Sequence, residues 1–292
     1  MKKAQFLNFP KRVTHPMNID LARRFRGIER LYGLQNTETI KRAHICVIGV
    51  GGVGSWVVEA LARSGIGALT LIDLDQIAES NVNRQIMALT SQLGRAKVTV
   101  LRNRVYDINP AAQVEVIEDF VETDNYQEFF QRSFDFVIDA IDNLKVKAFL
   151  ADYFVKKGQA FVVAGAAGGK SSSAFIDYQD LSLVHHDRLL ASLRYHLRRQ
   201  FAFPGRGLMQ VPCVYSSEEA KSPQGCETKD LENGLSCAGY GSSMIVTAAF
   251  ALRLSEVALN HIMSTTESKI DQQSFMAVSY THLRAHETVL DL

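Results

Sequence analysis

The chain has 292 residues, of which 47% are hydrophobic and 22% are charged, and its formal net charge is +1. This composition is typical of a globular protein with one large α/β domain, alone or with an appendage. The near-neutral charge argues against a dedicated polyanion-binding protein, although a local basic patch is compatible with it, and we expect no DNA partner. The four cysteines contain no C-x-x-C pair, which argues against a disulfide scaffold and a paired-cysteine zinc site and favours a cytoplasmic location.

Strands and helices are predicted to alternate through the first half of the chain. Residues 19–32 space their apolar side chains as a helix does, and Gly33 follows as a natural stop. Apolar runs then predict buried strands at 44–50, 68–73, 113–119, 134–142 and 160–165. Amphipathic stretches predict helices at 55–63, 94–108, 124–132 and 144–158. This rhythm predicts an α/β fold with a doubly wound, mostly parallel, Rossmann-like sheet.

The alternation stops after Gly169. Residues 170–237 combine a predicted strand, a basic helix at 187–200 and a loop rich in Ser, Pro and Gly, which indicates an insertion that carries specificity. The apolar stretch 244–259 is about 16 residues long, shorter than the roughly 20 of a membrane helix, so we expect it to pack on the fold; attachment to a membrane surface is the alternative. Residues 277–292 continue no earlier pattern, and we interpret them as a non-native tail, with a natural helix as the alternative.

A glycine motif, G-x-G-x-x-G, follows the first strand and opens a helix. Gly49 permits a tight turn, Gly51 lets the backbone approach a phosphate, and Gly54 lets the helix pack on the strand. The helix N-terminus offers free N–H groups to the anion. Asp73 and Asp75 end the next strand, where a carboxylate can bind ribose hydroxyls. Taken alone, this unit favours NAD.

A second glycine-rich stretch, residues 164–171, resembles a relaxed phosphate loop that ends in Lys170 and Ser171. A phosphate loop leads from a strand into a helix. The residues that follow, 172–178, alternate as a strand does, so we favour a tight turn at the edge of the sheet that lines the substrate site.

The segment after Asp75 favours a triphosphate over NAD. It carries Asn83, Arg84 and Gln85 close together, and Lys97 on the next predicted helix. A guanidinium and an ammonium beyond the glycine turn suit the charge that develops as pyrophosphate leaves. Asp142, at the carboxyl end of a later strand, has the chemistry of a Mg²⁺ ligand beside phosphates; capping of the following helix is the alternative role.

Residues 23–166 contain five motifs in this order: G-x-G-G-x-G, D-x-D, N-x-x-R-Q, G-x-x-K and D-x-x-D-N. Together they resemble the adenylating domain of ubiquitin-activating enzymes and sulfur-carrier adenylyltransferases. The resemblance implies ATP and Mg²⁺ as cofactors, with Arg84, Lys97 and Asp142 as catalytic residues. It also implies a homodimer in which Arg24 or Arg30 reaches the triphosphate bound by the partner subunit. The implied nucleotide ligands are Gly49, Gly51, Gly52, Gly54, Asp73, Asp75, Asn83, Arg84, Gln85, Lys97 and Asp142.

Residues 19–263 also contain longer characteristic stretches, among them RLYG, EALARSGIGALTLIDLD, NRQIMAL and VPCVYSSE. These stretches resemble the tRNA threonylcarbamoyladenosine dehydratase family. That family uses ATP to activate the threonyl carboxylate of the modified adenosine, which then cyclises with loss of water. The resemblance implies an ATP-binding core at 19–169, a tRNA-binding insertion at 170–237 and a helix at 238–265 that packs on the core. The alternative is an adenylyltransferase that acts on the C-terminal glycine of a ubiquitin-like sulfur carrier.

The tRNA hypothesis predicts a basic surface beside the site. The basic helix and the loop after it offer arginines for phosphates, with aromatic residues between them for unstacked bases; a solvated helix face is the alternative. The expected tRNA contacts are Arg194, Arg198, Arg199 and Arg206. Cys213 and Cys237 are candidates for a chemical role, although buried, inert cysteines are more common. A cysteine-desulfurase system is a further implied partner.

Overall fold

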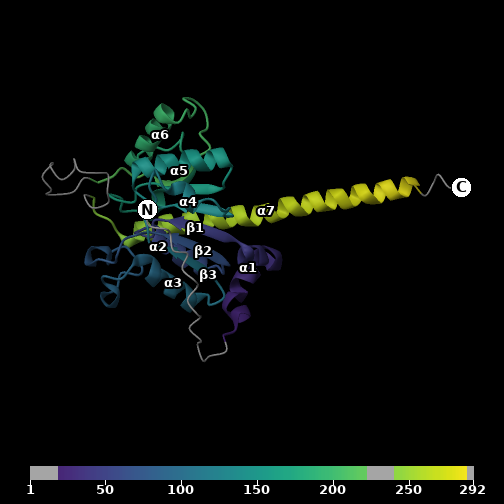
Figure 1. The fold of residues 1–292 in the computed structure, drawn as a ribbon, viewed down its shortest axis with the longest axis horizontal. Helices are drawn as coiled ribbons and strands as arrows, with labels where there is room; N and C mark the ends of the chain where they lie inside the picture. Colours follow the sequence, from purple (N-terminus) through teal and green to yellow (C-terminus); the bar gives the residue numbers. More distant parts are fainter. Residues whose placement is uncertain (1–18, 222–239, 288–292) are drawn as a thin grey trace.

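The computed structural model describes residues 19–221 and 240–287, with the side chains of the last helix described as far as Thr265 (Figure 1). The helices are α1 (Leu21–Arg42), α2 (Gly54–Arg63), α3 (Lys97–Ile108), α4 (Tyr126–Phe129), α5 (Leu144–Lys157), α6 (Arg188–Gln200) and α7 (Met244–Glu287). The strands are β1 (His44–Ile48), β2 (Ala68–Ile72), β3 (Gln113–Ile117), β4 (Phe136–Asp139), β5 (Phe161–Ala164), β6 (Ile176–Asp180) and β7 (Pro212–Ser216).

All seven strands form one sheet in the order β3-β2-β1-β4-β5-β7-β6. Every neighbouring pair is parallel except β6 and β7. Ile48 at the end of β1 pairs with Ile72 of β2 and with Asp139 of β4, so three strands end side by side. The turns that follow them therefore meet at one edge, where open α/β sheets bind ligands.

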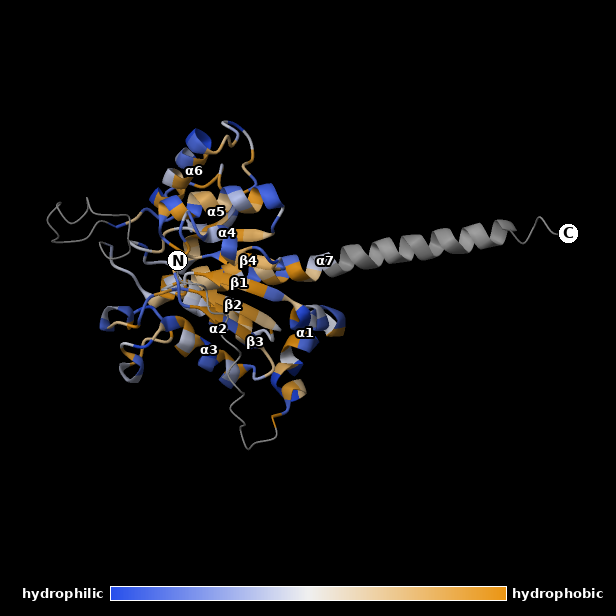
Figure 2. Cartoon of the chain, viewed as in Figure 1, coloured by the Kyte–Doolittle hydropathy of each residue, from blue (hydrophilic) through white to orange (hydrophobic). Residues whose placement is uncertain are grey.

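Side chains alternate between two cores because successive strand residues face opposite sides of the sheet. Ile45 and Val47 pack with α2, α3 and α7, whereas Cys46 and Ile48 pack with α5 and α6. Figure 2 shows the apolar strands between helices whose outer faces are hydrophilic. The expected doubly wound, mostly parallel sheet is confirmed.

Two predicted elements differ from the structure. Gly33 adopts φ +81°, which ends the first segment of α1 as expected, but a second segment continues to Arg42, so residues 39–42 are helical. The predicted helix at 124–132 is only the short α4. Phe130 ends it because its buried ring packs edge-to-face on Phe134 and Phe154, which draws the chain toward the core.

The predicted insertion at 170–237 contributes β6 and β7 to the main sheet, so its described part is continuous with the core. Residues 222–239, with Cys226 and Cys237, lie outside the described residues, and the division of the chain into domains stays a prediction. Helix α7 continues over residues 277–287, and the origin of the tail expected there also stays a prediction. Residues 288–292 lie outside the described part.

The segment Met244–Thr265 of α7 is long and apolar enough to cross a membrane, but half of its most apolar window is buried inside the fold. Its buried face contributes Val246, Phe250 and Leu254 to the core shared with α2. The same helix contacts β4 and β5, so it lies against the sheet.

Candidate nucleotide site

A cavity of about 870 Å³ opens at the carboxyl edge of the sheet. Its walls come from the turns after β1, β2, β4 and β5, the start of α3, and the start of α7. It gathers most of the expected nucleotide ligands, namely Gly49, Gly51, Gly52, Asp73, Asp75, Arg84, Gln85, Lys97 and Asp142.

The glycine turn is closed by contacts that exclude side chains. Gly49 has φ +77°, and its N–H donates to the Ile72 carbonyl at 2.9 Å. A Cβ atom on Gly54 would lie only 1.9 Å from the Gly49 carbonyl oxygen, so Gly54 allows α2 to begin against the turn without lining the cavity. Helix α2 has no side-chain N-cap, which leaves backbone N–H groups available near Gly51 and Gly52.

Asp73 is fixed by two backbone bonds. Its carboxylate accepts from Val50 N–H at 2.8 Å in the glycine turn and from Asp75 N–H at 2.9 Å. Burial raises the pKa of Asp73 above its ordinary value, although nearby Lys97 acts in the opposite direction. The side chain thus joins the ends of β1 and β2 at the cavity wall.

Lys97 and Asp75 form an ion pair of 2.6 Å at the same wall. The Lys97 side chain is only 6% exposed, whereas that of Asp75 is 54% exposed. Lys97 is the first residue of α3, so the turn before this helix places a buried ammonium group in the cavity.

Arg84 lines the cavity beside the glycine turn, where a Cβ atom on Gly52 would lie 3.4 Å from its side chain. Its guanidinium Nη1 donates to the Ser80 carbonyl at 2.7 Å and to Asn83 Oδ1 at 2.9 Å, and Trp56 Nε1 donates to the Arg84 carbonyl at 2.9 Å. Gln85 is buried, and its Oε1 has no hydrogen-bond partner in the described part of the chain. Asn83 was an expected nucleotide ligand, but it does not line the cavity.

The sequence allowed two roles for Asp142, a Mg²⁺ ligand or the cap of the following helix, and the structure gives the cap to Asn143. Asn143 caps α5, because its side chain accepts from Val146 N–H, whereas Asp142 is exposed and lines the cavity. Among residues 19–221 and 240–265, the Asp142 carboxylate makes no hydrogen bond or ion pair, and no group of three or more acidic, His or Cys side chains is placed to hold a metal. Asp142 therefore offers an uncommitted carboxylate at the cavity.

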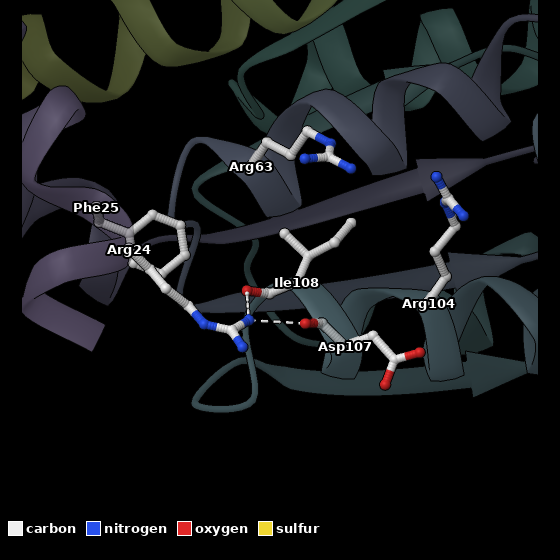
Figure 3. A pocket seen from close by; sticks show the side chains of 6 residues that line it. All are labelled: Arg24, Phe25, Arg63, Arg104, Asp107 and Ile108. Atoms are coloured by element: carbon white, nitrogen blue, oxygen red, sulfur yellow. Dashed lines mark hydrogen bonds between the residues drawn. The ribbon is translucent and has the colours of Figure 1, made fainter. Parts of the chain in front are cut away.

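Arg24 lies in a second pocket, of about 490 Å³, between α1 and the ends of α2 and α3 (Figure 3). Its Nη1 donates to the carbonyls of Asp107 and Ile108, both at 2.7 Å, near Arg63 and Arg104. Helix α3 starts at the large cavity and ends here, about 18 Å away at 1.5 Å per residue. Neither Arg24 nor the exposed Arg30 lines the cavity of this chain.

One wall of the cavity, formed after β3, was not predicted from the sequence, and the turn after β5 was predicted only in outline. Residues 119–124, after β3, line it together with Leu189 and Thr247. Their signal was position alone, since they follow a parallel strand. The turn at 164–167 lines the cavity as expected for a tight turn, and Lys170 instead donates to the carbonyls of His186, Ser216 and Glu218. A strand, β6, follows it, which contradicts the phosphate-loop interpretation.

The four arginines expected to contact tRNA differ in whether their side chains are already bonded within the fold. Arg194 Nη1 donates to the carbonyls of Leu181 and Val184, and Arg198 donates to the Pro204 carbonyl. Arg199 lies over the ring of Tyr195 and bonds its hydroxyl, and Arg206 is exposed. Arg194 and Arg198 thus hold the local fold, whereas the other two arginines face solvent.

Cys213 is the second residue of β7 and is fully buried. Its thiol donates to the Val211 carbonyl, and burial raises its pKa well above the ordinary value. A buried thiol with a raised pKa is a poor nucleophile.

The strand order and the cavity, which Arg84 and Lys97 line together with the glycine turn, place this molecule among the Rossmann-like adenylating enzymes. Comparison with known proteins gives the family: the chain belongs to the ThiF family, whose model matches residues 23–286. The resemblance seen in the motifs is thereby confirmed.

Relatives named tRNA threonylcarbamoyladenosine dehydratase cover most of the chain. The protein from Haemophilus influenzae is 44% identical over 234 residues, 78% of this chain and 88% of its own. The protein from Escherichia coli is 40% identical over 260 residues, 86% of this chain and 96% of its own. The crystal structure of the Escherichia coli tRNA N6-threonylcarbamoyladenosine dehydratase in complex with ATP superimposes with a TM-score of 0.75 at 38% identity, covering 86% of this chain and 97% of that one.

Proposed function

We propose that this protein is an ATP-dependent tRNA-modifying enzyme that dehydrates and cyclises threonylcarbamoyladenosine in tRNA and releases AMP and pyrophosphate. The observation that carries the proposal is the likeness, over most of the chain, to relatives of this name, one of them crystallised with ATP. The cavity supports it, because its polar walls have the charges that a nucleoside triphosphate requires.

The proposed roles of the cavity residues follow from their charge and their present partners. Backbone N–H groups of the glycine turn and the side chains of Arg84 and Lys97 bind the phosphates. Lys97 exchanges its bond to Asp75 for a phosphate oxygen, which leaves the exposed Asp75 to solvent. Asp73 accepts from the ribose hydroxyls through the lone pairs that its two backbone bonds leave free.

Asn83 has a positioning role in this scheme. It holds the Arg84 guanidinium through Oδ1 and the start of α7 through Nδ2. Gln85, whose buried Oε1 has no partner in the described part of the chain, can accept a hydrogen bond inside the cavity. Asn83 thus orients Arg84 without contacting the nucleotide, and Gly54 shapes the turn.

Mg²⁺ fits the cavity through Asp142. Magnesium in nucleotide sites is commonly held by one or two carboxylates together with substrate phosphates, and Asp142 offers one uncommitted carboxylate. When bound, the ion would neutralise charge on the phosphates as pyrophosphate leaves. The role of Asp142 is to hold it against the side of the cavity next to β4.

The reaction needs little beyond binding and orientation. A threonyl carboxylate oxygen displaces pyrophosphate from the α-phosphate of ATP, which gives an acyl adenylate. The ureido nitrogen of the same side chain then attacks the activated carbonyl, loses its proton and releases AMP, so one molecule of water is removed overall. The second step is intramolecular, and proximity supplies much of its rate. No thiol is needed, in keeping with the burial of Cys213.

Further parts of the proposal concern partners and location. Arg24 or Arg30 would reach the nucleotide of the other subunit in a homodimer, because neither lines the cavity of its own chain. Arg199 and Arg206 would contact tRNA phosphates beside Tyr195. We also propose a cytoplasmic location and an association with a cysteine-desulfurase system.

The second candidate function is adenylation of a ubiquitin-like sulfur carrier. A sulfur carrier protein adenylyltransferase from Thermus thermophilus is 32% identical over 130 residues, but these are only 44% of this chain. Both functions would use the same nucleotide cavity, so the substrate distinguishes them.

The test is to incubate the protein with ATP, Mg²⁺ and threonylcarbamoyl-modified tRNA and to measure the mass of the modified nucleoside. The proposal predicts a loss of about 18 Da, the mass of one water, and ATP–pyrophosphate exchange that depends on modified tRNA. Exchange that depends instead on a ubiquitin-like protein supports the second candidate. Binding of NADH without binding of ATP contradicts both.

A further inference from the structure

One buried carboxylate connects the basic helix α6 to the cavity. Asp187 is the N-cap of α6, and its Oδ1 accepts from Leu190 N–H at 3.0 Å. Its second oxygen, Oδ2, accepts from Ala166 N–H at 2.8 Å in the turn after β5. Asp187 thus spans two elements that are separated by about 20 residues of chain.

The turn that Asp187 holds forms a wall of the cavity. Gly165, Ala166 and Ala167 all line it, as does Leu189 in the first turn of α6. A Cβ atom on Gly165 would lie 2.3 Å from Asp187 Oδ2 and 3.0 Å from Leu190 Cδ1. The approach between α6 and this turn is therefore as close as a glycine permits, and Asp187 lies in the contact.

Capping alone does not explain a carboxylate in this position. Ser, Thr or Asn caps a helix as well as Asp does, and a surface cap avoids desolvation. Asp187 is only 4% exposed, and its burial disfavours the charged form and raises its pKa. The positive charges of Lys170 and Lys147 oppose this effect, and Lys147 is itself fully buried in an ion pair with Asp139. These positive charges favour the ionised Asp187 carboxylate, whose two oxygens bond the helix and the cavity wall at the same time.

We propose that Asp187 is a positioning residue that fixes helix α6 relative to the cavity wall at Gly165–Ala166, so that an RNA held along α6 presents its reacting group to the bound nucleotide. This inference rests on the proposed function, because it takes the RNA to lie along α6. It assigns Asp187 no contact with the substrate. A misplacement of about 1 Å between reacting groups is enough to slow a reaction by about 100-fold, so a rigid link has a kinetic consequence.

The decisive variant is Asp187→Asn. Asparagine has one acceptor oxygen instead of two, so it can keep the cap on Leu190 but turns its NH₂ group toward the Ala166 N–H. The matched control is Asp20→Asn at the N-cap of α1, where the carboxylate accepts from Arg23 N–H and, within the described residues, does not line the cavity. Each variant is compared with wild type for melting temperature, ATP dissociation constant, modified-tRNA dissociation constant and kcat.

For Asp187→Asn we expect a kcat at least about tenfold lower, with both dissociation constants within about threefold of wild type. Asp20→Asn should match wild type in all of them. A kcat of Asp187→Asn within about threefold of wild type overturns the inference, as does an equal loss in kcat and in ATP binding. If Asp187→Asn does not fold, Asp187→Ser, which keeps a capping hydroxyl but is too short for both bonds, is judged by the same criteria.

The same measurements separate this inference from the function on which it rests. A wild-type protein that leaves modified tRNA unchanged overturns the proposed function, and the inference falls with it. An active wild type with an equally active Asp187 variant overturns the inference alone.

Discussion

The side chain of Asn83 donates a 2.8 Å hydrogen bond to the backbone carbonyl of Ser242, across a sequence separation of 159 residues. Met244 N–H in turn donates to the Asn83 carbonyl. The loop that carries Arg84 is therefore tied to the start of α7, and Thr247 of that helix reaches the Arg84 carbonyl as well. The position of Arg84 in the cavity therefore depends on α7, a helix from the far end of the chain.

Replacement of Arg84 or Lys97 should abolish activity without unfolding the protein. We expect Arg84→Ala and Lys97→Ala each to lower kcat/KM at least about 100-fold, because each removes a positive charge from the cavity that we propose binds the phosphates. Melting temperatures should remain close to that of wild type. The control is Arg95→Ala, an exposed arginine that bonds Gln92 outside the cavity lining, and it should keep wild-type activity. Two fully active cavity variants would contradict the site assignment.

Substitution of Gly54 should be severe. A Cβ atom 1.9 Å from the Gly49 carbonyl oxygen forces the helix away from the turn, and we expect Gly54→Ala to lose about 3 kcal/mol or more in free energy of unfolding. Gly27→Ala is the matched control, since it occupies a helix and, in the described part of the chain, nothing beyond its own helix backbone and chain neighbours lies within 4 Å of its added Cβ. It should stabilise the protein by up to about 1 kcal/mol. Urea titrations of both variants check the contrast, and an equal effect would refute it.

Glu59 should make stability depend on pH. Burial opposes its ionisation, but hydrogen bonds and charges from Arg104 and Arg63 outweigh that effect and lower its pKa. A carboxyl group whose pKa is lower in the folded state stabilises the protein above its unfolded pKa, about 4.3, and loses that contribution as the pH falls through its folded pKa. Glu59→Gln should therefore reduce the free energy of unfolding by about 1–2 kcal/mol at pH 7. The difference from wild type should shrink below about pH 4; a difference independent of pH would count against the ion-pair explanation.

Cys213 should be chemically silent. Because the thiol is buried and its pKa is raised, we expect no reaction with iodoacetamide in the native protein and full activity in Cys213→Ala. Its loss of packing should appear only as a modest fall in melting temperature. Mass spectrometry of the alkylated native protein and the dehydration assay provide the two measurements, and an inactive variant of normal stability would show a chemical role.

The arginines on and after α6 should fall into two groups. Arg194→Ala leaves the carbonyls of Leu181 and Val184 without their side-chain donor, and we expect it to destabilise the fold by about 1–2 kcal/mol. Arg199→Ala and Arg206→Ala should instead weaken tRNA binding and reduce the salt dependence of the association constant by about one unit of log–log slope each. Binding titrations at several salt concentrations separate the two effects. Unchanged slopes would remove these two residues from the tRNA surface.

The fold was predictable because its signals are local. Apolar runs such as 44–50 and the glycines at their ends specify strands and turns within a few residues, and the parallel topology follows from their alternation with helices. The length of α4 was not predictable, because Phe130 leaves the helix to reach Phe154, a partner distant in sequence. Local patterns cannot report such a contact.

The site was predictable where its residues lie within a few positions of a strand end, as Asp73 and Asp142 do. It was not predictable where the hydrogen-bond partner of a side chain is set by the fold and not by the neighbouring sequence. Nothing near Asn83 in the sequence shows that it bonds Ser242, and nothing near Arg194 shows that it turns toward Leu181. Residues with identical chemistry, Arg194 and Arg199, differ only in what the fold places beside them.

Strand β6 has a consequence for how this protein behaves at high concentration. It is the last strand at one side of the described sheet and pairs only with β7, so its outer backbone groups could pair with a strand of another molecule. The strand is five residues long, and it carries Asp177 and Asp180, the second of which accepts backbone bonds from Met209 and Val211. A short edge with fixed negative charge repels an identical edge. The same strand that completes the sheet therefore disfavours extension of the sheet at this side.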